Sequence, residues 1–174
     1  MSRKGSMAIV GIALGMAALA GPGAVAAKAG KIYQPDMANC AGFTAADAAK
    51  VLGVPAAGVK AWTQSPHAFF WTCSFYAGRL RLEFSVAVSS TVEDAVTDME
   101  RYRENMELAA KTDAFKDSLP GGAWSRIPKL GDEAVWTDIN RTLRVRRGNV
   151  ILQVLAPAAK LEQIKVAEAF LKKL

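Results

Sequence analysis

The chain has 174 residues, and its 22 Lys and Arg against 16 Asp and Glu give a formal net charge of +6 at pH 7. This length suits one domain, which buries roughly 68–70% of its unfolded surface and so can form a core. So mild an excess of positive charge does not indicate nucleic-acid binding, which usually needs a dense basic stripe, and no nucleic-acid partner is expected.

The N-terminal 26 residues have the layout of a secretory signal peptide. Arg3 and Lys4 precede an apolar run over residues 7–20, and Ala24 and Ala26 form a small-residue cleavage site. The run is shorter than the roughly 20 apolar residues of a spanning helix, and an uncleaved N-terminal anchor is the alternative. We expect cleavage near Ala26, a mature chain with 20 basic and 16 acidic residues, and a periplasmic or secreted protein without stable membrane insertion.

After the signal peptide, residues 27–39 are expected to form a flexible N-terminal tether, and residues 40–174 a single domain. The first helix of this domain begins after Thr44, where Asp47 completes a capping box, and it ends at Gly53. Residues 54–68 are loop-like.

The middle of the chain predicts two strands and a long helix. Residues 69–76 are dense in aromatic and β-branched side chains, which is typical of a strand. Residues 80–88 alternate between apolar and polar side chains, which predicts a half-buried strand of an antiparallel sheet. A helix of about five turns follows, capped by Ser90 or Thr91, with apolar residues at steps of three and four. Its acidic residues are interpreted as a solvated face.

The last third is rich in strands. The long irregular stretch over residues 112–133 precedes three predicted strands and a final helix, which cover residues 134–139, 142–147, 150–155 and 160–174. Helices that alternate with antiparallel strands in this order predict an α+β fold. We expect an antiparallel sheet of about five strands with helices packed on one face, as a two-layer sandwich.

The mature chain has two cysteines, Cys40 and Cys73. An even number of cysteines in an oxidising compartment indicates a disulfide. A redox pair usually has the spacing C-x-x-C, which is absent, and a zinc site needs more ligands than the single histidine, His67, can add. We therefore expect a structural bridge, with no metal and no cofactor.

Basic residues gather on the outer face of the predicted sheet. Because Val145 faces the core, Arg144 and Arg146 point the other way, with Arg147 at the turn and Arg81 on another strand. Guanidinium groups on one face bind carboxylate or phosphate in bidentate geometry. An envelope protein or an anionic small ligand is the partner that this pattern favours, and a solvated sheet face is the alternative.

Two further features accompany these arginines. Ile151 and Leu155 lie on the same outer face and make it amphipathic, as at many partner sites. Trp124 follows two glycines in the 112–133 stretch, where it is either the aromatic tip of a lid or a plug at the edge of the core. Trp124 and the four arginines are therefore the candidate binding residues.

The absence of catalytic motifs favours a binding protein over an enzyme. The chain has no G-x-S-x-G, S-x-x-K, H-E-x-x-H, P-loop or G-x-G-x-x-G motif. We expect a non-enzymatic binding or accessory domain of the cell envelope. One alternative is a secreted inhibitor or immunity-type protein that inserts Trp124 into the cleft of an envelope hydrolase. Another is a periplasmic hydrolase with carboxylates from Asp132, Glu133 and a further strand.

Three segments together resemble a known family. They are residues 40–53 (CAGFTAADAAKVLG), Cys73 in its aromatic strand, and residues 131–149, which contain GDEAVW and LRVRRGN. The chain resembles a broad group of small exported bacterial domains of unknown function, best represented by actinobacterial cell-envelope lipoproteins. The resemblance implies an exported α+β domain with its two cysteines bridged and no established reaction. The chain lacks the lipobox of that group, which argues against a lipid anchor.

Overall fold

The structure is a computed structural model that describes residues 30–174 except 68–69, 113, 116–118, 120–121 and 158. The expected signal peptide over residues 1–26 lies outside the described residues. Within them the elements follow in the order η1 (Met37–Gly42), α1 (Ala45–Leu52), η2 (Ala56–Gly58), β1 (Lys60–His67), β2 (Phe70–Ala77), β3 (Leu80–Val88), α2 (Val92–Ala110), β4 (Ser125–Arg126), β5 (Glu133–Thr137), β6 (Thr142–Arg147), β7 (Val150–Ala156) and α3 (Lys160–Leu171).

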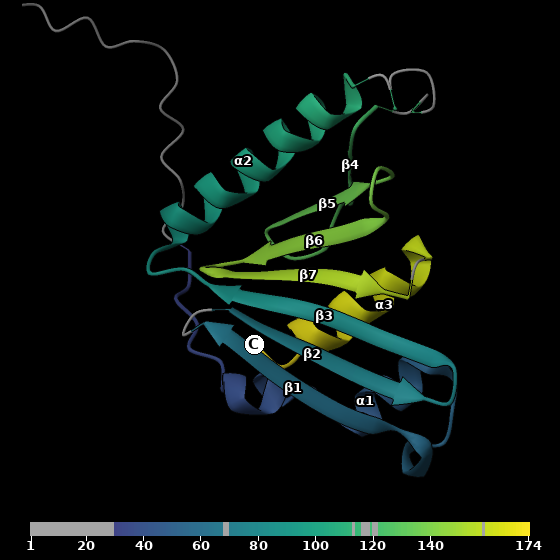
Figure 1. The fold of residues 1–174 in the computed structure, drawn as a ribbon. Coiled ribbons are helices and arrows are strands. Elements are labelled where there is room, and N and C mark those ends of the chain that lie inside the picture. The colour runs from purple at the N-terminus through teal and green to yellow at the C-terminus, as the bar shows by residue number, and fades with distance from the viewer. Residues whose placement is uncertain (1–29, 68–69, 113, 116–118, 120–121, 158) are drawn as a thin grey trace, which may run out of the picture.

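The strands form one antiparallel sheet in the order β1-β2-β3-β7-β6-β5-β4, as Figure 1 shows. The pairing of β3 with β7 joins the two halves of the chain, and Ser85 lies opposite Gln153 across it. The α+β class with helices against an antiparallel sheet is confirmed. The sheet has seven strands where about five were expected, because β1 and the two-residue β4 formed where the sequence suggested irregular chain.

The loop prediction for residues 54–68 is wrong over most of its length. β1 pairs with β2 in continuous register from Lys60 to Gln64, and the register shifts between Gln64 and His67. This strand contains Pro66, and proline is tolerated in a sheet only on edge strands or at bulges. An edge position therefore explains how a polar, proline-containing segment joins the sheet.

Helices lie on both faces of the sheet instead of one. α1 and α3 pack on the face that carries Trp136 and Leu152. On the other face, α2 packs Ala95, Met99 and Tyr102 against strand residues that alternate with the first set, Val135 and Ile151. Because β5 and β7 have apolar side chains on both faces, both need a cover, and α2 supplies the second one.

Helices α1 and α2 begin where the sequence predicts. The Thr44 hydroxyl accepts a hydrogen bond from the backbone N–H of Asp47, and the Asp47 carboxylate accepts one from the backbone N–H of Thr44 at 2.9 Å. Thr91 and Asp94 make the same capping box at α2. Each box satisfies backbone donors that the first turn leaves unpaired. The predicted helix starts are confirmed, and Thr91 is the cap of α2.

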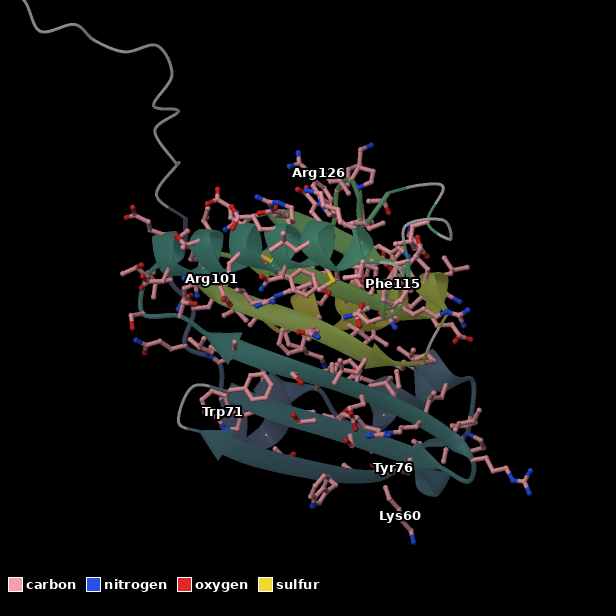
Figure 2. All side chains as sticks on the ribbon, turned by 45° about the horizontal axis from the view of Figure 1, so that its top comes forward. Lys60, Trp71, Tyr76, Arg101, Phe115 and Arg126 are labelled. Atoms are coloured by element: carbon pink, nitrogen blue, oxygen red, sulfur yellow. A yellow bond between two sulfur atoms is a disulfide. The ribbon has the colours of Figure 1, made fainter. Side chains whose placement is uncertain are left out.

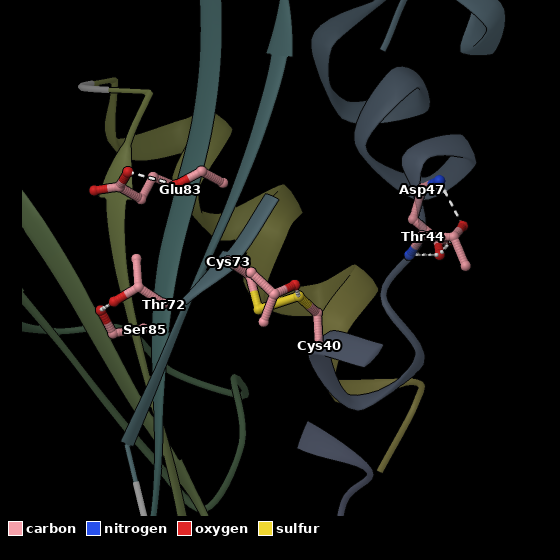
Figure 3. The surroundings of a disulfide bond; sticks show 9 residues. Cys40, Thr44, Asp47, Thr72, Cys73, Glu83 and Ser85 are labelled. Atoms are coloured by element: carbon pink, nitrogen blue, oxygen red, sulfur yellow. Dashed lines mark hydrogen bonds between the residues drawn. A yellow bond between two sulfur atoms is a disulfide. The ribbon is translucent and has the colours of Figure 1, made fainter. Parts of the chain in front are cut away.

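The disulfide between Cys40 and Cys73 is confirmed. It joins η1 to β2 with 6.0 Å between the Cα atoms, and both cysteines are buried, as Figure 3 shows. The same core cluster contains four aromatic rings in contact, from η1–α1, β2, β3 and α3: Phe43, Phe75, Phe84 and Phe170. Edge-on and tilted contacts of this kind add about 0.5–1.5 kcal/mol per pair beyond simple burial.

Part of the segment expected to be a tether is fixed to the domain. The backbone N–H of Tyr33 donates to Asn149 Oδ1 at 2.7 Å, and Asn149 Nδ2 donates back to the Tyr33 carbonyl at 3.2 Å. Asn149 lies in the β6–β7 turn and is itself buried. These bonds place residues near Tyr33 against the hairpin turn.

Candidate functional site

Half of one sheet face has no helix over it. α2 contacts β6 and β7 and packs on Val135 of β5, but among the described residues no element covers β1, β2 and β3 on that side, as Figure 1 shows. We call this surface the open face. Its side chains, placed by strand alternation and register, come from Lys60, Trp62, Phe70, Thr72, Ser74, Tyr76, Arg81, Glu83, Ser85, Gln153 and Leu155.

Large apolar side chains stand exposed on the open face. Trp62 is 54% exposed, and Tyr76, Leu155 and Phe70 are 37–38% exposed. Trp62 lies opposite Ser74, two residues from Tyr76 on β2, so the two aromatic residues are diagonal neighbours on one face. Figure 2 shows Tyr76 and Lys60 in this uncovered part of the sheet. These exposed apolar side chains make the open face a candidate contact surface.

Polar side chains on the open face are bonded to one another. Ser74 Oγ donates to Glu83 Oε2 at 2.7 Å, and Arg81 forms an ion pair with the same carboxylate. The hydrogen bond from Arg81 to Glu83 raises the pKa of the guanidinium. Thr72 and Ser85 share a hydroxyl contact at 3.4 Å. The polar side chains between the aromatic residues therefore already have hydrogen-bond partners in one another, and the charges of Arg81 and Glu83 cancel.

Arg81 is the one predicted binding residue that lies on the open face. Its guanidinium carbon is 5.8 Å from the centre of the Tyr76 ring, and its side chain is 51% exposed. Arg and Tyr are enriched among the residues that dominate binding energy at protein interfaces. This pair lies next to Trp62 on the open face.

Arg144 and Arg146 point to the predicted side of the sheet, but they lie under α2 and away from Arg81. Arg144 Nη2 donates to Asp98 at 2.7 Å, and the Arg144 side chain is only 14% exposed. Arg146 Nη1 donates to Asp132 at 3.2 Å, and its side chain is 12% exposed. The sequence indicated an exposed arginine patch. The structure instead shows two largely buried guanidinium groups, each paired with a more exposed carboxylate.

Burial also changes the electrostatics of Arg144. Loss of solvation lowers the pKa of this guanidinium, although the charge of Asp98 opposes the shift. This cation is already paired with Asp98 and largely removed from solvent, so it offers little to an incoming anion.

Trp124 packs against the α2 side of the core. Its indole Nε1 donates to Glu107 at 3.1 Å, and the guanidinium of Arg103 lies 5.7 Å from its ring centre. The ring is half-buried against the cluster that contains Met99 and Val135. These contacts agree with the plug interpretation of this residue.

Arg147 lies on the other face of the sheet. It alternates with Arg146 along β6 and therefore points to the side of α3, where its Nη1 donates to the Leu171 carbonyl at 2.8 Å. The four candidate arginines thus fall into three places: the open face, the α2 interface and the α3 side.

The carboxylates of the hydrolase alternative are both ion-paired. Glu133 pairs with Arg103, and its second oxygen lies 3.8 Å from Arg146 Nε. Asp132 accepts from the Gly148 backbone at 2.7 Å as well as from Arg146. Nowhere in the described part of the chain do three or more His, Cys, Asp or Glu side chains gather as a metal site would require.

Sequence reasoning missed Trp62, because it interpreted that segment as a loop, and it did not single out Tyr76. Large side chains at every second position, Lys60, Trp62 and Gln64, were a signal for a strand. Pro66 obscured this signal because proline is rare inside strands. Leu155 was expected on the outer face and is exposed there, whereas Ile151 is buried beneath α2.

Comparisons of the chain with models of known families, with curated proteins and with solved structures find no match. None of the helices in the described ranges has both the length and the apolar character needed to cross a membrane.

Proposed function

We propose that this protein is a non-enzymatic binding domain exported to the periplasm, and that the open face is its contact surface. The observation that carries the proposal is the set of exposed Trp62, Tyr76 and Leu155 side chains on an uncovered half-sheet. The resemblance to exported cell-envelope domains supports the location, and a disulfide fits an oxidising compartment.

The partner is an envelope protein with an apolar contact surface and a carboxylate opposite Lys60. Glu83 compensates the charge of Arg81, whereas no described carboxylate lies within ion-pair distance of the exposed Lys60 side chain. Lys60 stands directly opposite Tyr76 across the β1–β2 pair, beside the aromatic residues. One unpaired cation next to an apolar patch favours a partner with complementary charge.

The edge of β1 is a poorer contact than the face. Pro66 cannot donate a backbone hydrogen bond, and the register shift between Gln64 and His67 breaks the regular ladder. Natural proteins use prolines, lysines and bulges in this way to prevent edge-to-edge pairing. Strand addition by a partner would have to overcome these features, whereas the face is open.

The experiment is crosslinking and pull-down of the mature protein in its own periplasm, followed by affinity measurement with the purified partner. We expect a stoichiometric partner whose affinity falls at least tenfold with the double substitution Trp62→Ala and Tyr76→Ala, because such residues carry about 1–2 kcal/mol or more each at interfaces. The matched control is Leu108→Ala with Leu161→Ala, which removes two apolar side chains exposed elsewhere on the protein.

Two results would overturn the proposal. If the partner bound the Trp62 and Tyr76 variant as tightly as the control variant, the open face would not be the contact surface. If the protein crosslinked to nothing and ran as a monomer, protein binding itself would be wrong.

A further inference from the structure

A hollow on the α3 side of the sheet has a basic lining. It has a volume of about 530 Å³, within the range of small-molecule sites, and lies between the chain around Lys129–Asp132, the end of β6 and the end of α3. Its charged side chains are Lys129, Asp132, Arg147, Glu168 and Lys172. It is separate from the open face, because Arg147 points to the opposite side of the sheet.

Arg147 differs from the other candidate arginines in having no carboxylate partner among the described residues. Its Nε donates to the Tyr33 hydroxyl at 3.1 Å and its Nη1 to the Leu171 carbonyl at 2.8 Å, both of them neutral acceptors. A guanidinium has five N–H donors, so three remain for another acceptor. The side chain is half-buried, and a cation removed from water without a counter-charge is unfavourable.

The carboxylates of the hollow do not supply that counter-charge. Asp132 is occupied by the Gly148 backbone N–H at 2.7 Å and by Arg146, whose charge lies on the other face of the sheet. Glu168 is then the single carboxylate in the lining that faces three cations: Lys129, Arg147 and Lys172. The hollow therefore carries a net positive charge that its own residues leave uncompensated.

We propose that this hollow binds a small molecule through a phosphate or carboxylate group, which Arg147 holds with its free N–H groups. Lys129 and Lys172 contribute charge from the two rims. A planar guanidinium with free donors matches the oxygens of either group. This site does not depend on the proposed protein partner, because it uses different residues on the opposite face.

A purely structural role for Arg147 is the competing explanation. A cation that donates to the last carbonyls of a helix stabilises the helix end, and Arg147 does so at Leu171. That role does not need the lysine side chains. The backbone N–H of Lys172 donates to the Phe170 carbonyl at the end of α3, and Lys172→Gln keeps that bond, whereas neither lysine has a side-chain hydrogen bond to α3 or Arg147 among the described residues. Substitutions of the lysines therefore separate ligand binding from helix capping.

The test is titration of the mature protein with inorganic phosphate and with citrate, each compared with sodium chloride at equal ionic strength. Binding is followed by calorimetry and by the amide NMR signals of Gly131 and Gly148, which lie beside the hollow. We expect saturable binding of at least one anion, with shifts at these two amides. The double substitution Lys129→Gln and Lys172→Gln should weaken it about fivefold, as two exposed charge interactions of about 0.5 kcal/mol would.

The control is Lys50→Gln with Lys165→Gln, which removes the same charge from exposed positions outside the hollow. Saturable binding of phosphate alone or citrate alone would support the site and identify which group it prefers. An equal loss of affinity in both double variants would overturn the proposal, as would anion effects no larger than those of chloride.

Discussion

Arg144 of β6 and Asp98 of α2 are joined by a hydrogen-bonded ion pair, with 2.7 Å between Arg144 Nη2 and Asp98 Oδ2. The same guanidinium lies 4.6 Å from the centre of the Tyr102 ring, one turn along the helix. α2 thus contacts this one guanidinium through both a carboxylate and an aromatic ring. The contact lies where α2 crosses β6, on the same sheet face whose other half, over β1–β3, no described element covers.

The first prediction concerns this ion pair. Asp98→Ala would leave the largely buried Arg144 without its counter-charge, and we expect the free energy of unfolding to fall by about 1.5–3 kcal/mol. Glu100→Ala, which removes an exposed carboxylate from the same helix, is the control and should change it by less than about 0.5 kcal/mol. Urea unfolding followed by circular dichroism measures both. Equal effects of the two substitutions would mean that the pair contributes nothing specific.

The second prediction concerns Asp47, which closes the cap of α1 and also pairs with Lys173 of the C-terminal segment at 3.0 Å. Burial raises the pKa of this carboxyl, but hydrogen bonds from Thr44 and Lys173 outweigh it and hold the pKa below its ordinary value of 3.8. A depressed pKa in the folded state means that the stabilisation is present above that ordinary value and is lost as pH falls through the folded value.

Asp47→Ala should therefore lower the free energy of unfolding by about 1–2 kcal/mol at pH 7, and by clearly less at pH 3. Asp94→Ala removes the matching capping box of α2. Asp94 has no lysine partner among the described residues, and its loss should lower the free energy of unfolding by about 1 kcal/mol at pH 7. Unfolding curves at the two pH values measure this. A deficit of the Asp47 variant that stayed constant between pH 7 and pH 3 would contradict the assignment.

Local signals in the sequence were sufficient for much of the fold. The capping boxes at Thr44 and Thr91 depend on residues three positions apart, and the alternation over residues 80–88 needs no distant contact. The two-residue turn at Gly148 and Asn149 is also a local feature, and it sets the register in which Val145 lies opposite Leu152. Such features are decided within a few residues, which is why they could be predicted.

The site could not be predicted in the same way, because it depends on which element covers which surface. Alternation correctly placed Arg144 on the outer face, but only the packing of α2 shows that this face is buried there. Trp62 is exposed for the converse reason, since no described element lies over β1. Whether a side chain binds a partner or an internal carboxylate is a property of the tertiary arrangement.

The third prediction concerns the bridge between Cys40 and Cys73, which are 33 residues apart in the sequence. Replacing both cysteines by alanine frees the unfolded chain from this loop, and we expect a loss of about 3.5–4 kcal/mol of unfolding free energy in the chain-entropy model. Urea unfolding with and without a thiol reductant measures it. The reductant should destabilise the wild-type protein and leave the double variant unchanged; insensitivity of the wild-type protein would mean that the bridge contributes no stability.

The fourth prediction compares two glycines that occupy equivalent hairpin turns. Gly78 and Gly148 each begin a two-residue turn with a positive φ, +60° and +57° respectively. A Cβ at Gly78 would meet nothing within 4 Å, whereas one at Gly148 would lie 1.9 Å from the Lys31 carbonyl oxygen and 2.8 Å from the Tyr33 ring. Both turns need glycine for the positive φ, but only at Gly148 does another segment, around Lys31 and Tyr33, also lie too close to leave room for a side chain.

Gly78→Ala should therefore lower the free energy of unfolding by about 1–2 kcal/mol, because a residue with a side chain is strained at a positive φ. Gly148→Ala should lower the free energy of unfolding by at least about 1 kcal/mol more than Gly78→Ala does, because the segment around Tyr33 must move away from the turn. Urea unfolding gives the two values, and limited trypsin digestion should cut after Lys31 faster in the Gly148 variant alone. Equal stability losses with equal cleavage rates would show that the segment around Tyr33 does not depend on this close approach.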